Sequence, residues 1–508
     1  MRPMKLSMLV LLCAGTLLMA SPGSAQTNAN ADSQQVIEEA LKPSPLEANL
    51  RKLTDDIGGR VPGTAAMQKA IAWGTAAFTA AGGENVHTEA FKIPASWSEG
   101  RTELAIHWQA SGVSGNQTGN TMSFSPRVVS LAWAPPLAPH RGVPIIDVGN
   151  GSADQFARAG SLNGAIVLVH SEEMKTWEDL FAEYLNAPAI IDRAVKGKAL
   201  AIAFQSTRPH DLLYRHTNST SGEIDRLPMV LVAREDASRM ARLLADGQKL
   251  RADISIPNQI GGPVSSANVI AELKGSEKPN EFVILGAHLD SWELGTGALD
   301  NGCNAALVID ALRAIKASGI QPHRTIRFLL FSGEEEGMTG SHAYVVAHRP
   351  ELDRVVGQVV FDSGIGRVTG FSLGGRKDAL DGATALVAPL KQFDASTLTT
   401  DATWGTDNFD FMLEGVPTFV ANQEEANYLI NYHASSDTFD KVDISQLKKH
   451  VAEAAELTLA LANAPERVAK RLHRAEIEQT MRETHLDEQL KTFGMWQDWE
   501  KGTRGRQD

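Results

Sequence analysis

One stretch, residues 281–302, constrains the fold more than any other part of the chain. It reads EFVILGAHLDSWELGTGALDNG, and Phe282 to Leu285 form a continuous apolar run with β-branched members. Such a run is typical of a strand buried on both faces of a parallel sheet. His288 and Asp290 follow at the carboxyl end of this strand, where open α/β sheets hold their ligands. Residues two apart on an extended segment point the same way, so we expect an imidazole and a carboxylate to face a common point.

After residue 268 the apolar pattern switches regularly between strands and helices. The predicted elements are a helix over 304–317 and strands over 325–331, 355–361 and 416–421. Alternation of this kind predicts an α/β fold, with a mostly parallel mixed sheet flanked by helices. Residues from about 115 to 265 differ, because short β-like runs dominate there and the segment has no dense cluster of His and acids. We interpret that segment as an inserted domain.

The first 25 residues have the pattern of a secretory signal peptide. Arg2 and Lys5 precede an apolar run, and small residues lead to a cleavage point after Ala25. The rest of the chain keeps one cysteine, Cys303, so it cannot form an internal disulfide. These features predict a secreted or periplasmic protein, and a bacterial periplasm fits the absence of disulfides best.

The full division of the chain follows from these changes in pattern. The expected parts are a signal peptide (1–25), the first part of the main domain (26–114), an inserted domain (115–265), the rest of the main domain (266–465) and a charged helical C-terminal extension (466–508).

Further metal-ligating side chains come directly after other predicted strands. Glu334 and Glu335 follow the strand at 325–331, Asp362 follows the next strand, and His433 follows the last one. Together with Asp300, this set of imidazole and carboxylate ligands suits zinc. Several acids at one sheet edge would repel each other strongly, and a pair of divalent cations would balance their charge.

These motifs resemble those of a known family. They are His288-x-Asp290, Asp300-Asn301, Ser332-Gly333-Glu334-Glu335-x-Gly337, Asp362 and Tyr432-His433. The set is similar to that of the secreted aminopeptidase-type metallopeptidases with two co-catalytic zinc ions, and most similar to the plasma glutamate carboxypeptidase (carboxypeptidase Q) branch. The resemblance covers roughly residues 35–465. It implies that the main domain is a zinc peptidase domain and that the insertion is a β-rich protease-associated domain.

The resemblance also implies a role for each matching residue. Asp300 would bridge two Zn²⁺ ions per chain together with a water or hydroxide, and the peptide bond after it would be cis. The remaining metal ligands would be His288 and Asp362 in one site and Glu335 and His433 in the other. Glu334 would act as the general base, Asp290 would orient His288, and Tyr432 would assist at the developing oxyanion.

The implied function is that of an exported zinc exopeptidase. It would hydrolyse dipeptides or remove amino-terminal residues from short peptides, through a metal-bridged water that Glu334 deprotonates. Three alternatives stay open: a carboxypeptidase with the same site, a single-zinc glutaminyl cyclase, and a non-catalytic binding protein on the same fold.

Charge and hydropathy bear on the partners. The net charge of −13 disfavours nucleic acid as a partner. No segment beyond the signal peptide has the ~18 consecutive apolar residues that a membrane span requires. A short peptide is the expected substrate, and the resemblance implies a homodimer.

Overall fold

The computed structural model describes residues 22–109, 120–402 and 404–508. The predicted signal peptide therefore falls outside the described residues, apart from the few that begin helix α1 (Pro22–Leu41). Residues 26–35 lie within this helix, although the sequence pattern gives no apolar face for them. None of the helices in the described part of the chain is long and apolar enough to cross a membrane.

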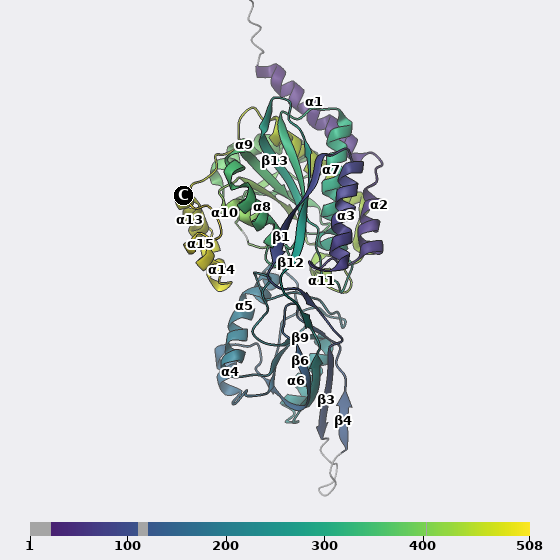
Figure 1. Cartoon of the computed structure of the whole chain (residues 1–508), viewed down its shortest axis with the longest axis vertical. Helices are drawn as coiled ribbons and strands as arrows, with labels where there is room; N and C mark the ends of the chain where they lie inside the picture. The colour runs from purple at the N-terminus through teal and green to yellow at the C-terminus, as the bar shows by residue number, and fades with distance from the viewer. Residues whose placement is uncertain (1–21, 110–119, 403) are drawn as a thin grey trace, which may run out of the picture.

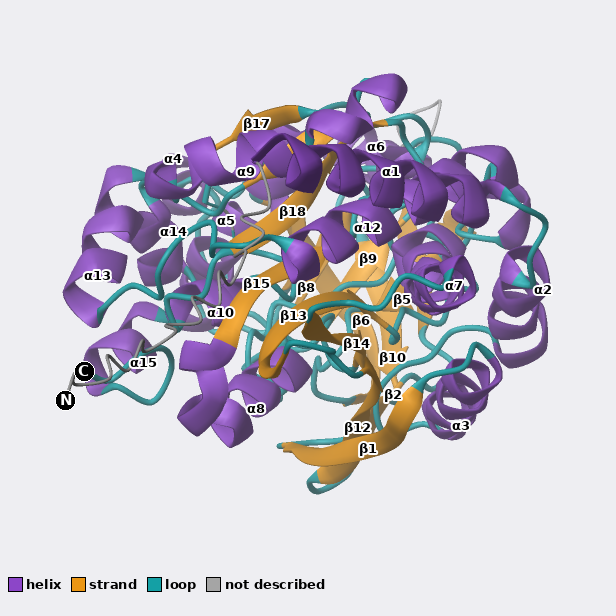
Figure 2. Ribbon diagram, turned by 90° about the horizontal axis from the view of Figure 1, so that it is seen from above, coloured by secondary structure: helices purple, strands orange, loops and turns teal. Residues whose placement is uncertain are grey.

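The larger of two domains is built on an eight-stranded sheet with the order β1-β12-β14-β13-β15-β18-β16-β17 (Figures 1 and 2). Its four central strands, which run parallel, are β14 (Arg324–Phe331), β13 (Lys278–His288), β15 (Val355–Val360) and β18 (Thr418–Gln423). The outer strands are β1 (Glu84–Ile93), β12 (Val264–Leu273), β16 (Val368–Ser372) and β17 (Thr397–Thr399).

The sheet is mixed, as predicted, and contains both parallel and antiparallel pairs of strands. Strand β12 is antiparallel to β1 and β14, and β16 is antiparallel to β18. Residues 274–277, which connect β12 to β13, are too few for the crossover of a dozen or more residues that a parallel return requires. The fold is therefore a mixed α/β fold, with parallel pairing among the four central strands and between β16 and β17.

Helices cover both faces of this sheet. One face holds α3 (Ala65–Ala80), α7 (Cys303–Ser318) and α12 (Ile444–Asn463), and α1 packs outside α7 and α12. The other face holds α8 (Thr339–His348) and α10 (Phe409–Leu413). Shorter helices are α2 (Leu46–Arg51), α9 (Leu380–Leu386) and α11 (Tyr428–Asn431). Helix α7 ends at Gly319, whose φ of 76° is the left-handed conformation that commonly stops a helix.

A second domain, below the first in Figure 1, contains another eight-stranded sheet of order β4-β3-β10-β6-β7-β8-β9-β5. Its strands are β3 (Glu103–Gln109), β4 (Thr121–Phe124), β5 (Val128–Ser130), β6 (Leu137–Asp147), β7 (Ile166–Val169), β8 (Ala201–Gln205), β9 (Met229–Val232) and β10 (Arg251–Ile256). Its helices are α4 (Ala153–Arg158), α5 (Trp177–Lys196) and α6 (Arg234–Ala245).

This second sheet draws on residues before the predicted boundary at 115, because β3 pairs with β10 within it. The chain enters and leaves the second domain side by side, where β2 (Trp97–Ser98) pairs with β11 (Gln259–Ile260). The C-terminal residues form α13 (Arg474–Glu483), α14 (Leu486–Thr492) and α15 (Trp496–Lys501). These helices pack around a buried apolar cluster on the first domain, to which Phe409 and Met412 of α10 belong.

Candidate active site

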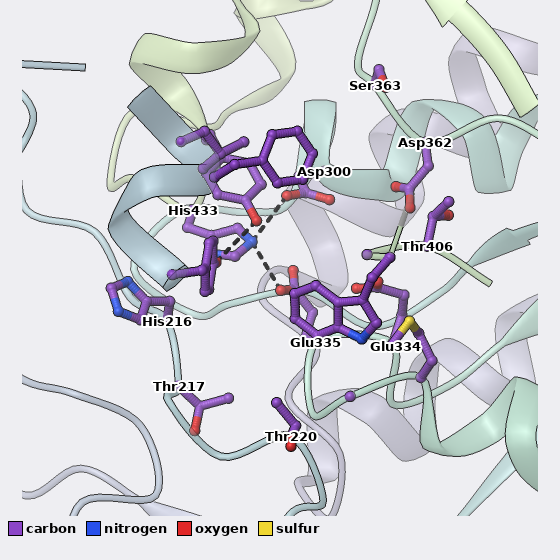
Figure 3. A pocket seen from close by; sticks show the side chains of 18 of the residues that line it. His216, Thr217, Thr220, Asp300, Glu334, Glu335, Asp362, Ser363, Thr406 and His433 are labelled. Carbon is purple, nitrogen blue, oxygen red and sulfur yellow. Dashed lines mark hydrogen bonds and ion pairs between the residues drawn. The ribbon is translucent and has the colours of Figure 1, made fainter. Parts of the chain in front are cut away.

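The carboxyl ends of the central strands bring the predicted ligands together. His288 is the last residue of β13, Glu335 follows β14, and Asp362 follows β15. His433 comes shortly after α11. Asp300 lies in the turn that precedes α7. Figure 3 shows the carboxylates of Asp300, Glu335 and Asp362 and the imidazole of His433 around one cavity.

Two groups of possible metal ligands share Asp300. In the first, His288 Nε2 lies 3.1 Å from Asp300 Oδ1 and 3.0 Å from Asp362 Oδ1. In the second, His433 Nε2 lies 2.9 Å from Glu335 Oε2 and 3.2 Å from Asp300 Oδ2. Each carboxylate oxygen of Asp300 thus faces a different histidine. In each group the ligand atoms all lie within 4.8 Å of one another.

These spacings fit zinc. Two ligand atoms that each lie about 2.0–2.2 Å from a tetrahedral zinc ion are about 3.3 Å from each other. The observed separations between imidazole nitrogen and carboxylate oxygen, 2.9 to 3.2 Å, are close to that value. Glu335 Oε1 is also buried without a hydrogen-bond partner among the described residues. The donor set can therefore hold two cations that share one carboxylate.

The electrostatics of the site lead to the same conclusion. Burial raises the pKa of Glu335 well above its ordinary value, and repulsion from Asp300 raises it further. Burial also raises the pKa of Glu334 and that of Asp362, each of which has other carboxylates beside it. Burial alone would lower the pKa of His288, but the carboxylate of Asp362 and its neighbours outweigh burial and raise it well above the usual range. Buried acids that repel each other in this way are stabilised by a divalent cation.

The turn that carries Asp300 is held by Asp437. One oxygen of the Asp437 carboxylate accepts the backbone N–H groups of Ala298 and Leu299 at 3.1 and 2.7 Å, and the other accepts that of Asp300 at 3.1 Å. The peptide bond between Asp300 and Asn301 is cis, as predicted. Asp437 therefore fixes the backbone from which the shared carboxylate projects.

Arg60 supports the same region from the opposite side. Its guanidinium donates hydrogen bonds to the carbonyls of Leu289, Thr296 and Gly297 at 2.6, 2.7 and 2.9 Å. Arg60 is not among the site residues predicted from the sequence. A signal was available, because Arg60 interrupts the turn-forming run Gly58-Gly59-Arg60-Val61-Pro62-Gly63.

The predicted positioning residue Asp290 contacts both sides of the site. His288 Nδ1 lies 3.1 Å from the backbone carbonyl of Asp290 and 3.7 Å from its Oδ1, so the carbonyl is the closer acceptor. The other carboxylate oxygen, Oδ2, accepts the backbone N–H of Glu335 at 3.2 Å. Asp290 thus orients His288 mainly through its backbone, and it orients the segment of Glu335 through its side chain.

A cavity of about 410 Å³ opens onto these groups. Glu334 and Tyr432, the other predicted catalytic residues, both line it. The ring of Tyr432 stacks on the imidazole of His433, with 3.6 Å between the ring centroids. Asp290 is fully buried behind the cavity.

Several lining residues were not predicted from the sequence. From the second domain, the segment from His216 to Thr220 lines the cavity (Figure 3), and so does Tyr184 on α5. Trp292 and Trp404 contribute from loops of the first domain. Phe493 contributes from the C-terminal extension. These residues carry no metal-ligand pattern, so only the tertiary structure reveals them.

Comparisons with known proteins agree with this geometry. Residues 268–458 match the model of the family described as peptidase family M28. Carboxypeptidase Q of Mus musculus is 26% identical over 420 residues, which cover 82% of this chain and 85% of that protein.

Two solved structures share the fold. That of a peptidase M28 precursor from Shewanella amazonensis superimposes with a TM-score of 0.78 at 23% identity, over 88% of this chain and 99% of that one. A zinc aminopeptidase from Bacillus subtilis superimposes with a TM-score of 0.63 at 19% identity, over 84% and 97% of the two chains.

Proposed function

The chain belongs to peptidase family M28 and is a zinc metallopeptidase related to carboxypeptidase Q, and on this premise we propose that it removes the amino-terminal residue from dipeptides and short peptides. Membership of this family makes it a metallo-exopeptidase, which leaves open which end of the peptide it reads. The proposed zinc ligands are those predicted from the sequence: His288, Asp300, Glu335, Asp362 and His433.

The charge of the cavity lining carries the choice of the amino end. A site that reads a free carboxylate usually offers it an Arg or Lys side chain. Among the described residues that line the cavity there is neither, whereas Asp300, Glu334, Glu335 and Asp362 are all carboxylates. Bound zinc would offset the charge of the ligands Asp300, Glu335 and Asp362, so the contrast rests on the missing cation. A peptide carboxylate has no Arg or Lys partner in this lining, and a free amine requires none. This contrast favours an aminopeptidase over a carboxypeptidase.

Glu334 is the proposed general base. It lines the cavity beside Glu335, and burial raises the pKa of its carboxyl group, which makes it a stronger base toward water. Glu334 would take a proton from the attacking water and later transfer that proton to the leaving amine. Bound zinc would supply Lewis acidity, which polarises the scissile carbonyl and lowers the pKa of water from about 15.7 toward neutrality.

Tyr432 is the proposed donor to the developing oxyanion. Tyr432 lines the cavity, and burial raises the pKa of its hydroxyl well above the ordinary value, so the hydroxyl keeps its proton at neutral pH. A protonated hydroxyl can donate a hydrogen bond to the oxygen that gains charge during attack.

We also propose that the protein is exported, on the basis of the pattern in residues 1–25.

Blocked dipeptides test which end is read. Leu-Ala amide has a free amine and no carboxylate, whereas N-acetyl-Leu-Ala has a free carboxylate and no amine. The proposal predicts hydrolysis of the amide at a rate within about tenfold of that of Leu-Ala, and no hydrolysis of the acetylated peptide. Cleavage of the acetylated peptide with loss of the amide as a substrate would instead make the protein a carboxypeptidase.

A further inference from the structure

The C-terminal extension reaches the active-site cavity. Helices α13, α14 and α15 pack on the first domain through an apolar cluster that includes Met338 and Leu413. Phe493 directly follows α14 and lines the same cavity as Glu334 and His433. The extension is therefore part of the wall of the site.

The position of the extension is fixed by a buried ion pair. Arg504 donates from Nε and Nη2 to the two carboxylate oxygens of Asp410 at 2.8 and 2.6 Å, and Asp410 is fully buried. Arg504 Nη2 also donates to the carbonyl of Gly337 at 3.2 Å. Gly337 lies two residues after Glu335, so the extension is attached directly to the loop that carries the proposed base and ligand. A bidentate pair of this kind restrains both partners.

Three rings from distant parts of the chain meet at this wall. The Phe493 ring stacks on Trp404, with 4.3 Å between centroids and 26° between planes. Trp404 meets Tyr184 of α5 edge to face, at a centroid distance of 6.4 Å. All three side chains line the cavity, and Figure 1 shows α14 near α5. We name the set of Phe493, Trp404 and Tyr184 the aromatic wall.

We propose that the aromatic wall binds an apolar side chain of the peptide substrate, so that the C-terminal extension determines selectivity. This inference rests on the proposed peptidase function. The proposed zinc ligands line one part of the cavity, where the scissile bond would bind, and the wall offers an apolar surface within the same 410 Å³ space. Aromatic rings bind aliphatic and aromatic side chains through buried apolar area, without any need for a charged partner.

Phe493→Ala tests the proposal through ratios of kcat/KM between substrates. The quantities compared are kcat/KM for Leu-Ala and for Ala-Leu, each divided by kcat/KM for Ala-Ala. In the variant we expect one of these ratios to fall about tenfold, since a hydrophobic subsite typically discriminates by that factor or more. kcat/KM for Ala-Ala should fall by a smaller factor, since a methyl side chain buries little apolar area against the wall. Whichever of the two ratios changes identifies the residue of the peptide that contacts the wall.

Phe393→Ala is the matched control, because Phe393 is also a partly buried phenylalanine but packs on the main core and does not line the cavity. It should leave both ratios unchanged. Phe493→Leu keeps an apolar side chain against Trp404 and should give an intermediate ratio, which separates loss of the wall from loss of folding. Unchanged ratios in a folded Phe493→Ala protein that still cleaves Ala-Ala would overturn the proposal while leaving the peptidase function intact.

Failure of the peptidase function would look different. In that case the wild-type protein would cleave none of the dipeptides, and calorimetric titration with L-leucine and L-alanine would take the place of the rate measurement. The proposal predicts tighter binding of leucine than of alanine, with the difference reduced about tenfold by Phe493→Ala. Equal binding of the two amino acids to the wild type would overturn it.

Discussion

The hydroxyl of Tyr184 lies 3.0 Å from the hydroxyl of Tyr432, although 248 residues separate the two in the sequence. Tyr184 belongs to α5 of the second domain, and Tyr432 precedes the proposed ligand His433. Burial raises the pKa of both hydroxyls well above the ordinary value, so both keep their protons at neutral pH. The second domain thus supplies a hydrogen-bond partner to a proposed catalytic group.

Tyr432→Phe removes the proposed donor to the oxyanion. We expect kcat for Leu-Ala to fall about 100-fold, as is typical when one such donor is lost, with zinc content unchanged. Tyr184→Phe should lower kcat by a smaller factor, because Tyr432 keeps its hydroxyl and loses only its partner. Tyr344→Phe is the control, since that hydroxyl bonds Arg327 and does not line the cavity. An unchanged kcat in Tyr432→Phe would remove the proposed role.

Glu334→Gln and Glu335→Gln separate the base from the ligand at neighbouring positions. Glu334→Gln should retain zinc and lose turnover by about 1,000-fold, because the amide cannot accept a proton. Glu335→Gln should lose zinc as well, since Glu335 Oε2 faces His433 Nε2 at 2.9 Å. Metal analysis and kcat measured on the same samples distinguish the two variants. Near-wild-type turnover in Glu334→Gln would contradict the assignment of the base.

Asp437→Ala tests how the shared carboxylate is positioned. The change removes the acceptor of three backbone N–H groups around Asp300, so we expect zinc affinity to fall about 10- to 100-fold. Asp437→Asn keeps one side-chain oxygen and should have an intermediate effect. The measurement is competition for zinc with a chelator. Equal zinc affinity in Asp437→Ala and wild type would show that the turn holds its shape without this side chain.

The buried carboxyl group of Glu453 on α12 should make the stability of the protein depend on pH. Its carboxyl is fully buried, neither oxygen has a hydrogen-bond partner among the described residues, and burial raises its pKa from 4.5 to about 8. Between these values the folded protein holds a proton that the unfolded chain releases, so the free energy of unfolding falls as pH rises from about 4.5 to about 8.

Glu453→Gln should remove the part of the pH-dependent loss of stability that Glu453 causes. One pKa unit corresponds to about 1.4 kcal/mol, so we expect the variant to gain about 1–3 kcal/mol relative to wild type between pH 5 and pH 8. Denaturant unfolding at the two pH values measures the gain. Glu488→Gln, on an exposed position of α14, should give none. A pH dependence identical to that of wild type would show that Glu453 is not protonated in the fold.

Local patterns in the sequence predicted the centre of the fold well. The apolar run at Phe282 ends at His288 as expected, and the helix predicted around residues 304–317 is α7, Cys303–Ser318. Such elements are predictable because burial on both faces leaves a continuous apolar run, and a helix leaves a stripe. The candidate ligands His288, Glu335 and Asp362 could be predicted for the same reason, since each ends or follows a strand of this kind, whereas Asp300 precedes α7 and His433 follows α11.

Features that depend on distant contacts could not be predicted. The ring of Phe493 meets Trp404 because the extension packs on the first domain through an apolar cluster and the buried pair of Arg504 and Asp410, and no local pattern encodes these contacts. Helix α5 is a further example: Pro188 lies inside it, which locally disfavours a helix, yet Leu180 and Ile191 are buried against neighbouring elements. The antiparallel direction of β12 likewise follows from its short connection to β13, over residues 274–277.

The central claim is that Asp300 joins two zinc sites, and zinc content per chain tests it most directly. Elemental analysis of protein purified without chelators should give about two zinc ions for the wild type. Asp300→Ala should lose zinc from both sites together with activity, because its two oxygens face His288 and His433 separately. One zinc ion or none in an active wild-type protein, or two in Asp300→Ala, would contradict the account.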